Sequence, residues 1–326
     1  MPNAPSAAET PRSRFITALD GGRPAGHVPT FELVFYLTME LLGRVHPTHR
    51  SFAQWDQMSP GERDRQVADI GDTYLETARR YRHDAIFLHG TPGIPDTETV
   101  VARYIRERTG GEFFLMRHGD ATLGMPDGEH MVEFSERLAD EPGAVKRRCA
   151  FDVDEALARA EGLAATGLFD GFALCTDYCL NTGPFLSPAQ FGEYVTPYLA
   201  RLTAGYRAMG FRVIKHTDGN LMPILDQLVQ AGPHALHSLD PQAGVDIAEV
   251  KRRYGRTVCL IGNVNCGLLQ TGTDAEVAAS CRYALRSGMP GGGYIFSTSN
   301  CVYSGMPLER YDLMMGVWRD EGAYRS

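Results

Sequence analysis

The stretch FRVIKHTDGN, residues 211–220, begins as an apolar strand-like run and ends in polar side chains and a glycine turn. The imidazole of His216 and the carboxylate of Asp218 stand two residues apart at this change. Imidazole is a poor turn former, so its place at the end of an apolar run needs another explanation. The stretch predicts a buried strand that ends in chemically reactive groups.

Seven more short apolar runs recur along the chain, and segments of helical character separate most of them. Apolar runs that alternate with helices are typical of parallel strands covered on both faces. Eight is the strand number of a (β/α)8 TIM barrel. We therefore predict an α/β protein in which residues 12–326 form a single-domain (β/α)8 barrel. The seven other expected strands are VPTFELV (28–34), DAIFLHG (84–90), EFFLMRHGD (112–120), GFALCTD (171–177), ALHSLDP (235–241), TVCLIGNVN (257–265) and GYIFSTSN (293–300).

Three segments between the runs are strong helix candidates, at residues 61–81, 152–167 and 187–210. The last begins with SPAQ, which offers a serine N-cap and a proline at the first helical position, and Gly210 is placed to end it. The competing architecture, a doubly wound open sheet, usually carries a Gly-rich phosphate loop. Neither GxGxxG nor GxxxxGK[ST] occurs in the sequence, which favours the barrel.

Composition narrows the choice of partners. The chain has 326 residues, with 32 Lys and Arg against 40 Asp and Glu, and a formal net charge of -8. This balance argues against nucleic acid or an anionic membrane as a partner and favours a small-molecule substrate. The seven cysteines are an odd number without a CxxC pair, which predicts reduced thiols. We expect a cytoplasmic protein whose residues 1–11 form a disordered tail.

Polar residues gather at the ends of the expected strands, which would surround the mouth of a barrel. Four of the ten histidines fall there. Such a set suits acid and base chemistry or a metal. The catalytic candidates are His216, Asp218, Asp177 and Tyr178, and the candidate metal ligands are His216, Asp218, Cys266 and Cys301. The candidates for substrate binding are Glu32, His89, Arg117, His118, His237, Asn263 and Asn300.

Each candidate also has an ordinary structural interpretation. Asp and Asn after a strand are common turn and N-cap residues. A buried histidine is most often hydrogen-bonded without any chemical role. A thiol at a strand end is a small buried hydrophobe about as often as it is a metal ligand.

Five motifs in order along the chain resemble the uroporphyrinogen decarboxylase superfamily. They are VPTFEL, GPFLSPAQFGEYVTPYLARL, KHTDGNLMPILDQLVQAG, GNVNCGLLQTGTDAEV and GGGYIFSTSNCVYSGMPLE. The resemblance implies a (β/α)8 barrel and suggests a homodimer. The superfamily also contains zinc-dependent methyltransferases that serve corrinoid proteins and coenzyme M.

Two marks of true decarboxylases are missing. Their N-terminal arginine motif, RQAGR, has no counterpart in FELVFYLTME (31–40), and His89 with Gly90 stands where their substrate-binding aspartate would end the second strand. A porphyrinogen with its many carboxylates also requires several cations, and the strand ends offer only Arg117 and Lys215. The resemblance is therefore closer to the methyltransferase branch.

The zinc pattern of that branch is kept only in part. Its His-x-Cys-Gly motif matches His216, but Asp218 stands in place of the cysteine, and Asn300 stands at the position of a later cysteine, with Cys301 one residue on. Two outcomes stay open. Either His216 and Asp218 bind zinc with a third ligand, or the metal is lost and they act as a base and its partner, or as residues lining a pocket. The choices for the third ligand are Cys266, Cys301, His237 and Glu32.

The leading hypothesis is transfer of a methyl or small alkyl group between a corrinoid carried by a partner protein, or a thiol, and a small substrate, with the assistance of zinc. The first alternative is a cofactor-independent decarboxylase acting on a smaller acid. The second is a non-catalytic barrel that binds a corrinoid or a metabolite.

Overall fold

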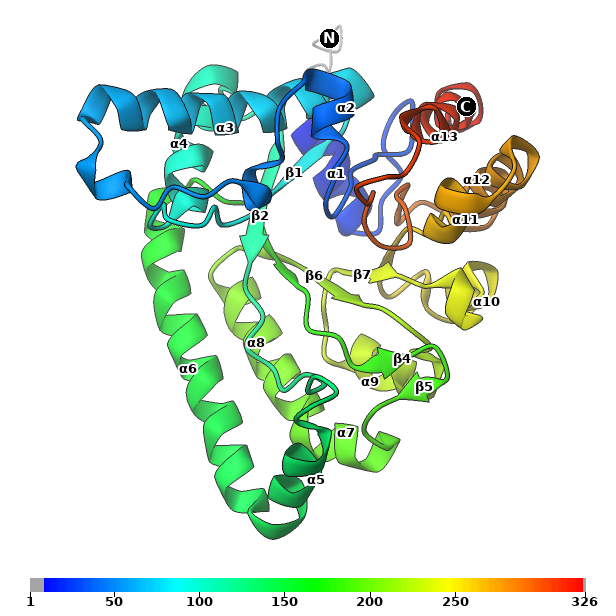
Figure 1. Ribbon diagram of the computed structural model, residues 1–326. Coiled ribbons are helices and arrows are strands. Elements are labelled where there is room, and N and C mark those ends of the chain that lie inside the picture. The colour runs from blue at the N-terminus through cyan, green and yellow to red at the C-terminus, as the bar shows by residue number, and fades with distance from the viewer. Residues whose placement is uncertain (1–8, 325–326) are drawn as a thin grey trace, which may run out of the picture.

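The computed structural model describes residues 9–324 and shows an α/β fold built on a curled parallel sheet of seven strands (Figure 1). The strand order is β1-β2-β3-β6-β7-β8-β9, so each strand pairs with the next one along the chain in this sheet. This arrangement is TIM-barrel-like. The strands are β1 (Ala85–Leu88), β2 (Phe114–His118), β3 (Gly171–Leu174), β6 (Arg212–Thr217), β7 (Ala235–Ser238), β8 (Cys259–Ile261) and β9 (Tyr294–Ile295).

Helices lie around the outside of this sheet, and α5, α6 and α7 extend furthest from it (Figure 1). A short antiparallel pair, β4 (Cys179–Leu180) and β5 (Gly183–Pro184), follows β3. The helices are α1 (Pro11–Leu19), α2 (Thr38–Leu42), α3 (Pro60–Tyr81), α4 (Thr97–Thr109), α5 (Met131–Asp140), α6 (Pro142–Thr166), α7 (Pro188–Tyr194), α8 (Thr196–Ala208), α9 (Leu225–Gln230), α10 (Ile247–Tyr254), α11 (Cys266–Thr271), α12 (Asp274–Gly288) and α13 (Leu308–Glu321).

The helix expected at 187–210 is divided at Val195 into α7 and α8. Its start is as predicted, because the Ser187 hydroxyl accepts a hydrogen bond from the Gln190 N–H and the Ser187 N–H donates one to the Gln190 side-chain oxygen. Pro197 explains the division, since proline has no N–H for the preceding turn and its ring disfavours helical geometry just before it. The helix expected at 152–167 begins earlier, at Pro142.

Seven of the eight expected runs contain a strand, but the first, VPTFELV (28–34), does not. Thr30 makes only an isolated parallel bridge to Phe296, beyond β9. On its other side the Thr30 N–H donates to the Asp84 carboxylate (2.9 Å), a side chain that replaces a backbone acceptor. Pro29 has no N–H to offer. The segment therefore lies between β9 and β1 without a regular ladder.

The inner face of the sheet carries its own apolar cluster, which includes Phe31, Phe114, Ile214 and Ile261. Helix α1 packs against one end of it, where the Phe15 ring lies 4.8 Å from that of Phe114. Side chains alternate along a strand, so a residue two places after Ile214 returns to the inner face. That residue is His216, which is thus placed inside the curled sheet near the carboxyl end of β6.

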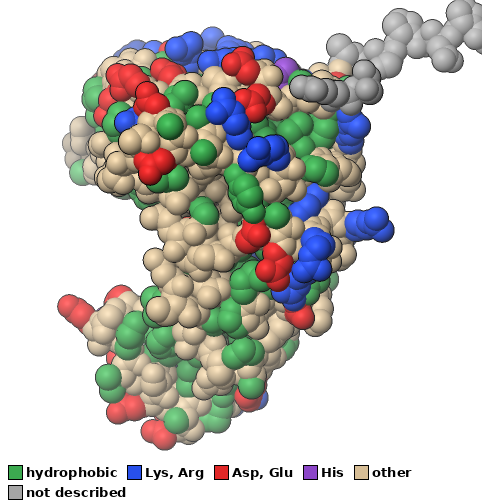
Figure 2. All heavy atoms as spheres, turned by 90° about the vertical axis from the view of Figure 1, so that its right-hand side faces the viewer, with side chains coloured by type: hydrophobic (Ala, Val, Ile, Leu, Met, Phe, Trp, Pro, Cys, Tyr) green, Lys and Arg blue, Asp and Glu red, His purple; other side chains and the backbone are tan. Residues whose placement is uncertain are grey.

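Two expectations concern the outer parts of the molecule. Residues 1–8 of the expected tail lie outside the described residues, and α1 already begins at Pro11. Within residues 9–324, every helix is too short or too polar to cross a membrane. Figure 2 shows one face on which acidic and basic side chains are interspersed, as the balanced composition leads us to expect.

Candidate functional site

Three of the expected site residues come together at the carboxyl ends of two neighbouring strands. Asp177 follows β3, His216 lies in β6 and Asp218 follows β6; one ligand atom from each lies within 4.8 Å of the others. His216 Nε2 is 3.6 Å from Asp218 Oδ1 and 3.9 Å from Asp177 Oδ1. We call Asp177, His216 and Asp218 the rim cluster.

The rim cluster is open to solvent on its carboxylate side. The side chain of His216 is only 5% exposed, whereas that of Asp218 is 28% and that of Asp177 is 41% exposed. A small molecule could therefore approach the carboxylates while the imidazole stays fixed in the protein interior.

Asp218 is held by hydrogen bonds from three sides. Its Oδ1 accepts the Ser238 hydroxyl (2.9 Å), its Oδ2 accepts the Asn300 amide, and its own N–H donates to Asp177 Oδ1 (2.9 Å). Ser238 has a φ of 84°, a left-handed conformation that a non-glycine residue adopts only when its surroundings enforce it. The backbone at the end of β7 is thus shaped to present a hydroxyl to Asp218.

The electrostatics of the rim cluster favour a bound cation. Burial, and then the charge of Asp177, raise the pKa of Asp218 to about 7. Burial, and then the charge of Lys215, lower the pKa of His216 to about 3, so its imidazole is neutral and one ring nitrogen keeps a lone pair. Two repelling carboxylates beside a neutral imidazole form a donor set that a divalent cation would stabilise.

The spacing of the rim cluster fits zinc. A tetrahedral ion with bonds of about 2.1 Å places its nitrogen and oxygen ligands about 3.4 Å from one another. The measured separations of 3.6 and 3.9 Å from His216 Nε2 lie close to that value. The three residues present would therefore leave a fourth position free on the exposed side.

The two cysteines proposed as further ligands do not join this group. Cys266 is the first residue of α11, and its thiol contacts the backbone carbonyl of Cys301 (3.5 Å). Among residues 9–324, the only group with the geometry of a three-ligand metal site is the rim cluster. Asp177, which the sequence suggested for catalysis, is the third member of the rim cluster because β3 and β6 are neighbours in the sheet.

Two candidates for substrate binding, His237 and Glu32, lie behind the rim cluster instead of beside its open face. His216 Nδ1 is 2.8 Å from His237 Nδ1, and the other nitrogen of His237 is 3.5 Å from the Ser297 hydroxyl. Ser297 in turn donates to Glu32 (3.2 Å). Burial raises the pKa of Glu32 from 4.5 to about 7, although four hydrogen bonds act against it.

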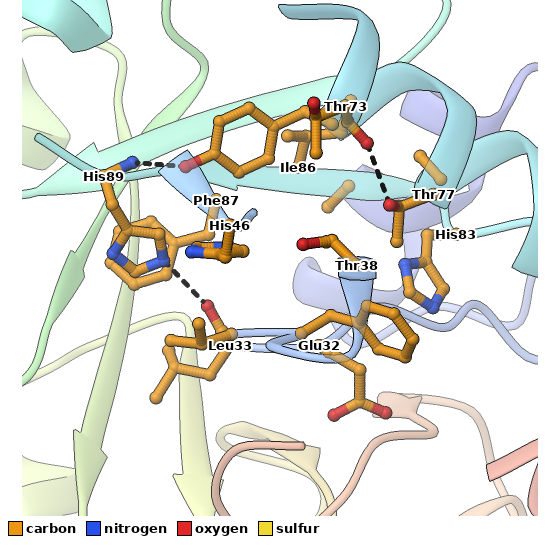
Figure 3. Close-up of a pocket in the computed structure, with 15 residues that line it drawn as sticks. Glu32, Leu33, Thr38, His46, Thr73, Thr77, His83, Ile86, Phe87 and His89 are labelled. Carbon is orange, nitrogen blue, oxygen red and sulfur yellow. Dashed lines mark hydrogen bonds between the residues drawn. The ribbon is translucent and has the colours of Figure 1, made fainter. Parts of the chain in front are cut away.

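Glu32 and His89 also line a small cavity between α3, β1 and the segment 28–38 (Figure 3). Its volume is about 40 Å³, which holds a few water molecules at most. His89 donates to the Leu33 carbonyl (3.1 Å), and burial lowers the pKa of His89 to about 3. In Figure 3 the Glu32 carboxylate points away from Thr38 and Thr77. The cavity is too small for a substrate.

Four other candidates make contacts that lie outside the rim cluster. Arg117 pairs with Asp96 and Glu98 in and before α4, and His118 packs on the Phe87 ring (4.5 Å). The Asn263 amide donates to the Leu239 carbonyl (2.8 Å). The buried Tyr178 hydroxyl is 2.5 Å from that of Thr122.

Sequence reasoning missed the ion pair beneath the site. Lys215, fully buried, donates to Asp120 (2.8 Å) and to the Thr176 carbonyl (2.7 Å), and its ammonium lies 4.1 Å from the centre of the Tyr178 ring. Burial raises the pKa of Asp120, but the charge and hydrogen bonds of Lys215 outweigh it, so the net shift is downward. A lysine inside an apolar strand run was the available signal, because such a residue is seldom buried without a partner.

Comparisons with known proteins agree with the resemblance found in the sequence. Residues 161–320 match the family model of uroporphyrinogen decarboxylase (URO-D). A uroporphyrinogen decarboxylase from Thioalkalivibrio sulfidiphilus is 24% identical over 246 residues, which are 67% of this chain and 64%, less than two thirds, of that protein. The solved structure of a methyltransferase from Methanosarcina mazei superposes with a TM-score of 0.72 at 16% identity, covering 95% of this chain and 98% of that one. At 16% identity the similarity to this methyltransferase structure concerns the fold alone.

Proposed function

From the match of residues 161–320 to the uroporphyrinogen decarboxylase family, and from the rim cluster, we propose that the protein is a metal-assisted methyl or small alkyl transferase of that superfamily. The observation that carries the proposal is the meeting of Asp177, His216 and Asp218 around one point that is open to solvent. In this proposal the one-carbon group moves between a small substrate and either a thiol or a corrinoid carried by a partner protein.

The residues of the rim cluster would hold the metal, and the position left free on the exposed side would receive the acceptor. Zinc bound at the rim cluster would supply Lewis-acid chemistry that lowers the pKa of a thiol or hydroxyl of the acceptor. His216 Nε2 and the two carboxylates provide the donors, and Ser238 and Asn300 fix the orientation of Asp218. The acceptor atom loses its proton and bonds to the methyl carbon, while the bond from that carbon to its donor breaks and its electron pair stays with the donor.

The charges near the site support methyl transfer over decarboxylation of a porphyrinogen. A substrate with many carboxylates requires cations, yet the rim cluster presents two carboxylates. The two cations at the strand ends, Arg117 and Lys215, are already engaged by Asp96, Glu98 and Asp120. A decarboxylase of a smaller acid remains the second candidate in our proposal, because Asp218, whose pKa is raised to about 7 by burial and then by Asp177, could give a proton to the carbon that loses carbon dioxide.

Three further statements belong to the proposal. Residues 12–326 form one closed (β/α)8 barrel, in which the segment 28–34 takes the eighth place between β9 and β1. The protein is cytoplasmic and acts as a homodimer. If light scattering at micromolar concentration gives the mass of a single chain, the proposed homodimer is wrong.

Metal content is the direct test of the proposed function. Protein dialysed with zinc and then against buffer without chelator should retain close to one equivalent by elemental analysis. Retention below about a tenth of an equivalent would remove the metal-assisted mechanism, since the site has the three donors that such a site needs.

Activity is the second test. Methylcobalamin can stand in for a methylated corrinoid protein, with 2-mercaptoethanesulfonate as the thiol acceptor. Transfer should change the visible spectrum of the corrinoid and should depend on added zinc. His216→Ala should abolish transfer, whereas Arg63→Ala, a substitution in the first turn of α3, should retain it. Equal rates for wild type and His216→Ala would contradict the proposal.

A further inference from the structure

A buried chain of hydrogen bonds leads from the rim cluster into the protein. It passes from His216 to His237 (2.8 Å), from His237 to Ser297 (3.5 Å) and from Ser297 to Glu32 (3.2 Å). All four side chains are buried, and they come from β6, β7, the segment after β9 and the segment 28–34. We call Glu32, Ser297 and His237 the inner relay.

The contacts of Glu32 set the direction of donation. In its ionised form Glu32 is an acceptor on every side, because the Tyr311 hydroxyl and the Thr298 N–H and hydroxyl also point at its carboxylate. Ser297 has one hydroxyl proton, and when Glu32 receives it, the serine oxygen is left to accept from His237.

The same count of protons extends through His237 to His216 in the rim cluster. The 2.8 Å approach of the two Nδ1 atoms makes one of them a donor and the other an acceptor, and His216 Nε2 lies too far from both carboxylates, at 3.6 and 3.9 Å, to donate a hydrogen bond to them. A His237 that donates from Nε2 has a bare Nδ1, which accepts the Nδ1–H of His216. His216 Nε2 is then bare and faces Asp177 and Asp218. One consistent set of protons therefore exposes a lone pair at the position where a cation would bind.

We propose that Glu32 and Ser297 are positioning residues that act through His237 to fix the tautomer and ring orientation of His216. The cation-binding consequence rests on the proposed function, but the tautomer itself does not. Groups behind a metal-binding histidine commonly fix its tautomer in this way and influence its affinity.

Matched variants separate the inner relay from general damage to the interior. Ser297→Ala removes the relay hydroxyl, and Ser299→Ala removes an equally buried hydroxyl two residues later that contacts Cys266 and lies outside the inner relay. Zinc affinity, measured by competition with a chromophoric chelator, should fall about tenfold in Ser297→Ala and less than about twofold in Ser299→Ala. Glu32→Gln should behave like Ser297→Ala, with Ser299→Ala again as the control.

Nitrogen NMR of histidine-labelled, metal-free protein gives a readout that does not depend on zinc. The ring nitrogens of His216, assigned with a His216→Gln sample, should report a bare Nε2 in wild type and in Ser299→Ala, and a changed or mixed tautomer in Ser297→Ala. If zinc binds but the two serine variants give the same affinity and the same tautomer, the inner relay is overturned and the proposed function stands. If zinc never binds but the tautomer changes only in Ser297→Ala, the relay stands and the proposed function fails.

Discussion

The pH dependence of stability should reveal the buried carboxyl of Glu32. Its pKa is raised from 4.5 to about 7, mainly by burial. Between these two values the folded chain holds a proton that the unfolded chain has released, so the free energy of unfolding falls as pH rises. The stabilising contribution of this group is complete below pH 4.5 and is lost as pH passes 7.

The size of the effect follows from the shift. A pKa difference of about 2.5 at about 1.4 kcal/mol per pH unit gives about 3.5 kcal/mol in full, of which about 3 kcal/mol is lost between pH 4.5 and 8. Glu32 is 6% exposed, so solvent screening reduces this figure little. Glu32→Gln removes the titration while keeping the shape of the side chain. Any change in hydrogen bonding adds a constant that does not vary with pH.

Urea denaturation of wild type and Glu32→Gln at intervals from pH 4.5 to 8 measures the effect. Over this range the unfolding free energy of wild type should fall by about 3 kcal/mol relative to that of Glu32→Gln. Other buried acids, such as Asp84, titrate in both proteins and cancel in the difference. Glu136→Gln, on the exposed surface of α5, controls for the loss of one negative charge. Parallel curves for wild type and Glu32→Gln would refute the reasoning.

Three further outcomes are expected. His216→Ala should reduce bound zinc to less than about a tenth of wild type, while Cys301→Ser should change it little because the cysteine lies outside the rim cluster; elemental analysis decides. Lys215→Met should lower the free energy of unfolding by about 3 to 5 kcal/mol, since it leaves Asp120 charged and buried; equal urea midpoints would contradict this. Gly219→Ala should lower the melting temperature, because φ is 80° there and a Cβ would lie 2.6 Å from the Cys179 carbonyl oxygen.

The sequence supported the fold well because the strands are short, apolar and separated by helices. Seven runs contain strands for this reason, and the carboxyl ends of β3 and β6 could be recognised as a site from Asp177, His216 and Asp218. The expectation that was wrong depended on contacts between residues far apart in the sequence. The residues of VPTFELV (28–34) alone do not indicate that the Thr30 N–H will donate to the Asp84 side chain instead of to the backbone of a neighbouring strand.

The same limit applies to the residue that joins His216 and Asp218 in the rim cluster. Cys266 and Cys301 follow strand ends as Asp177 does, and spacing alone could not rank them. Strand order ranks them, because β3 adjoins β6 whereas Cys266 begins a helix after β8. The hydrogen-bonded link from Glu32 to His216 could not be predicted either, because it passes through side chains from two other segments.

The two positions that depart from the zinc pattern of the methyltransferases are in contact with each other. Asp218 stands for one cysteine and Asn300 for the other, and the Asn300 amide donates to the Asp218 carboxylate. A carboxylate and its neutral hydrogen-bond donor in place of two thiolates reduce the negative charge of the site by one unit and make its donors harder. Asp177 then supplies the missing negative charge from the neighbouring strand. In our proposal the departures thus form one consistent change, from a sulfur site to an oxygen site around the same histidine.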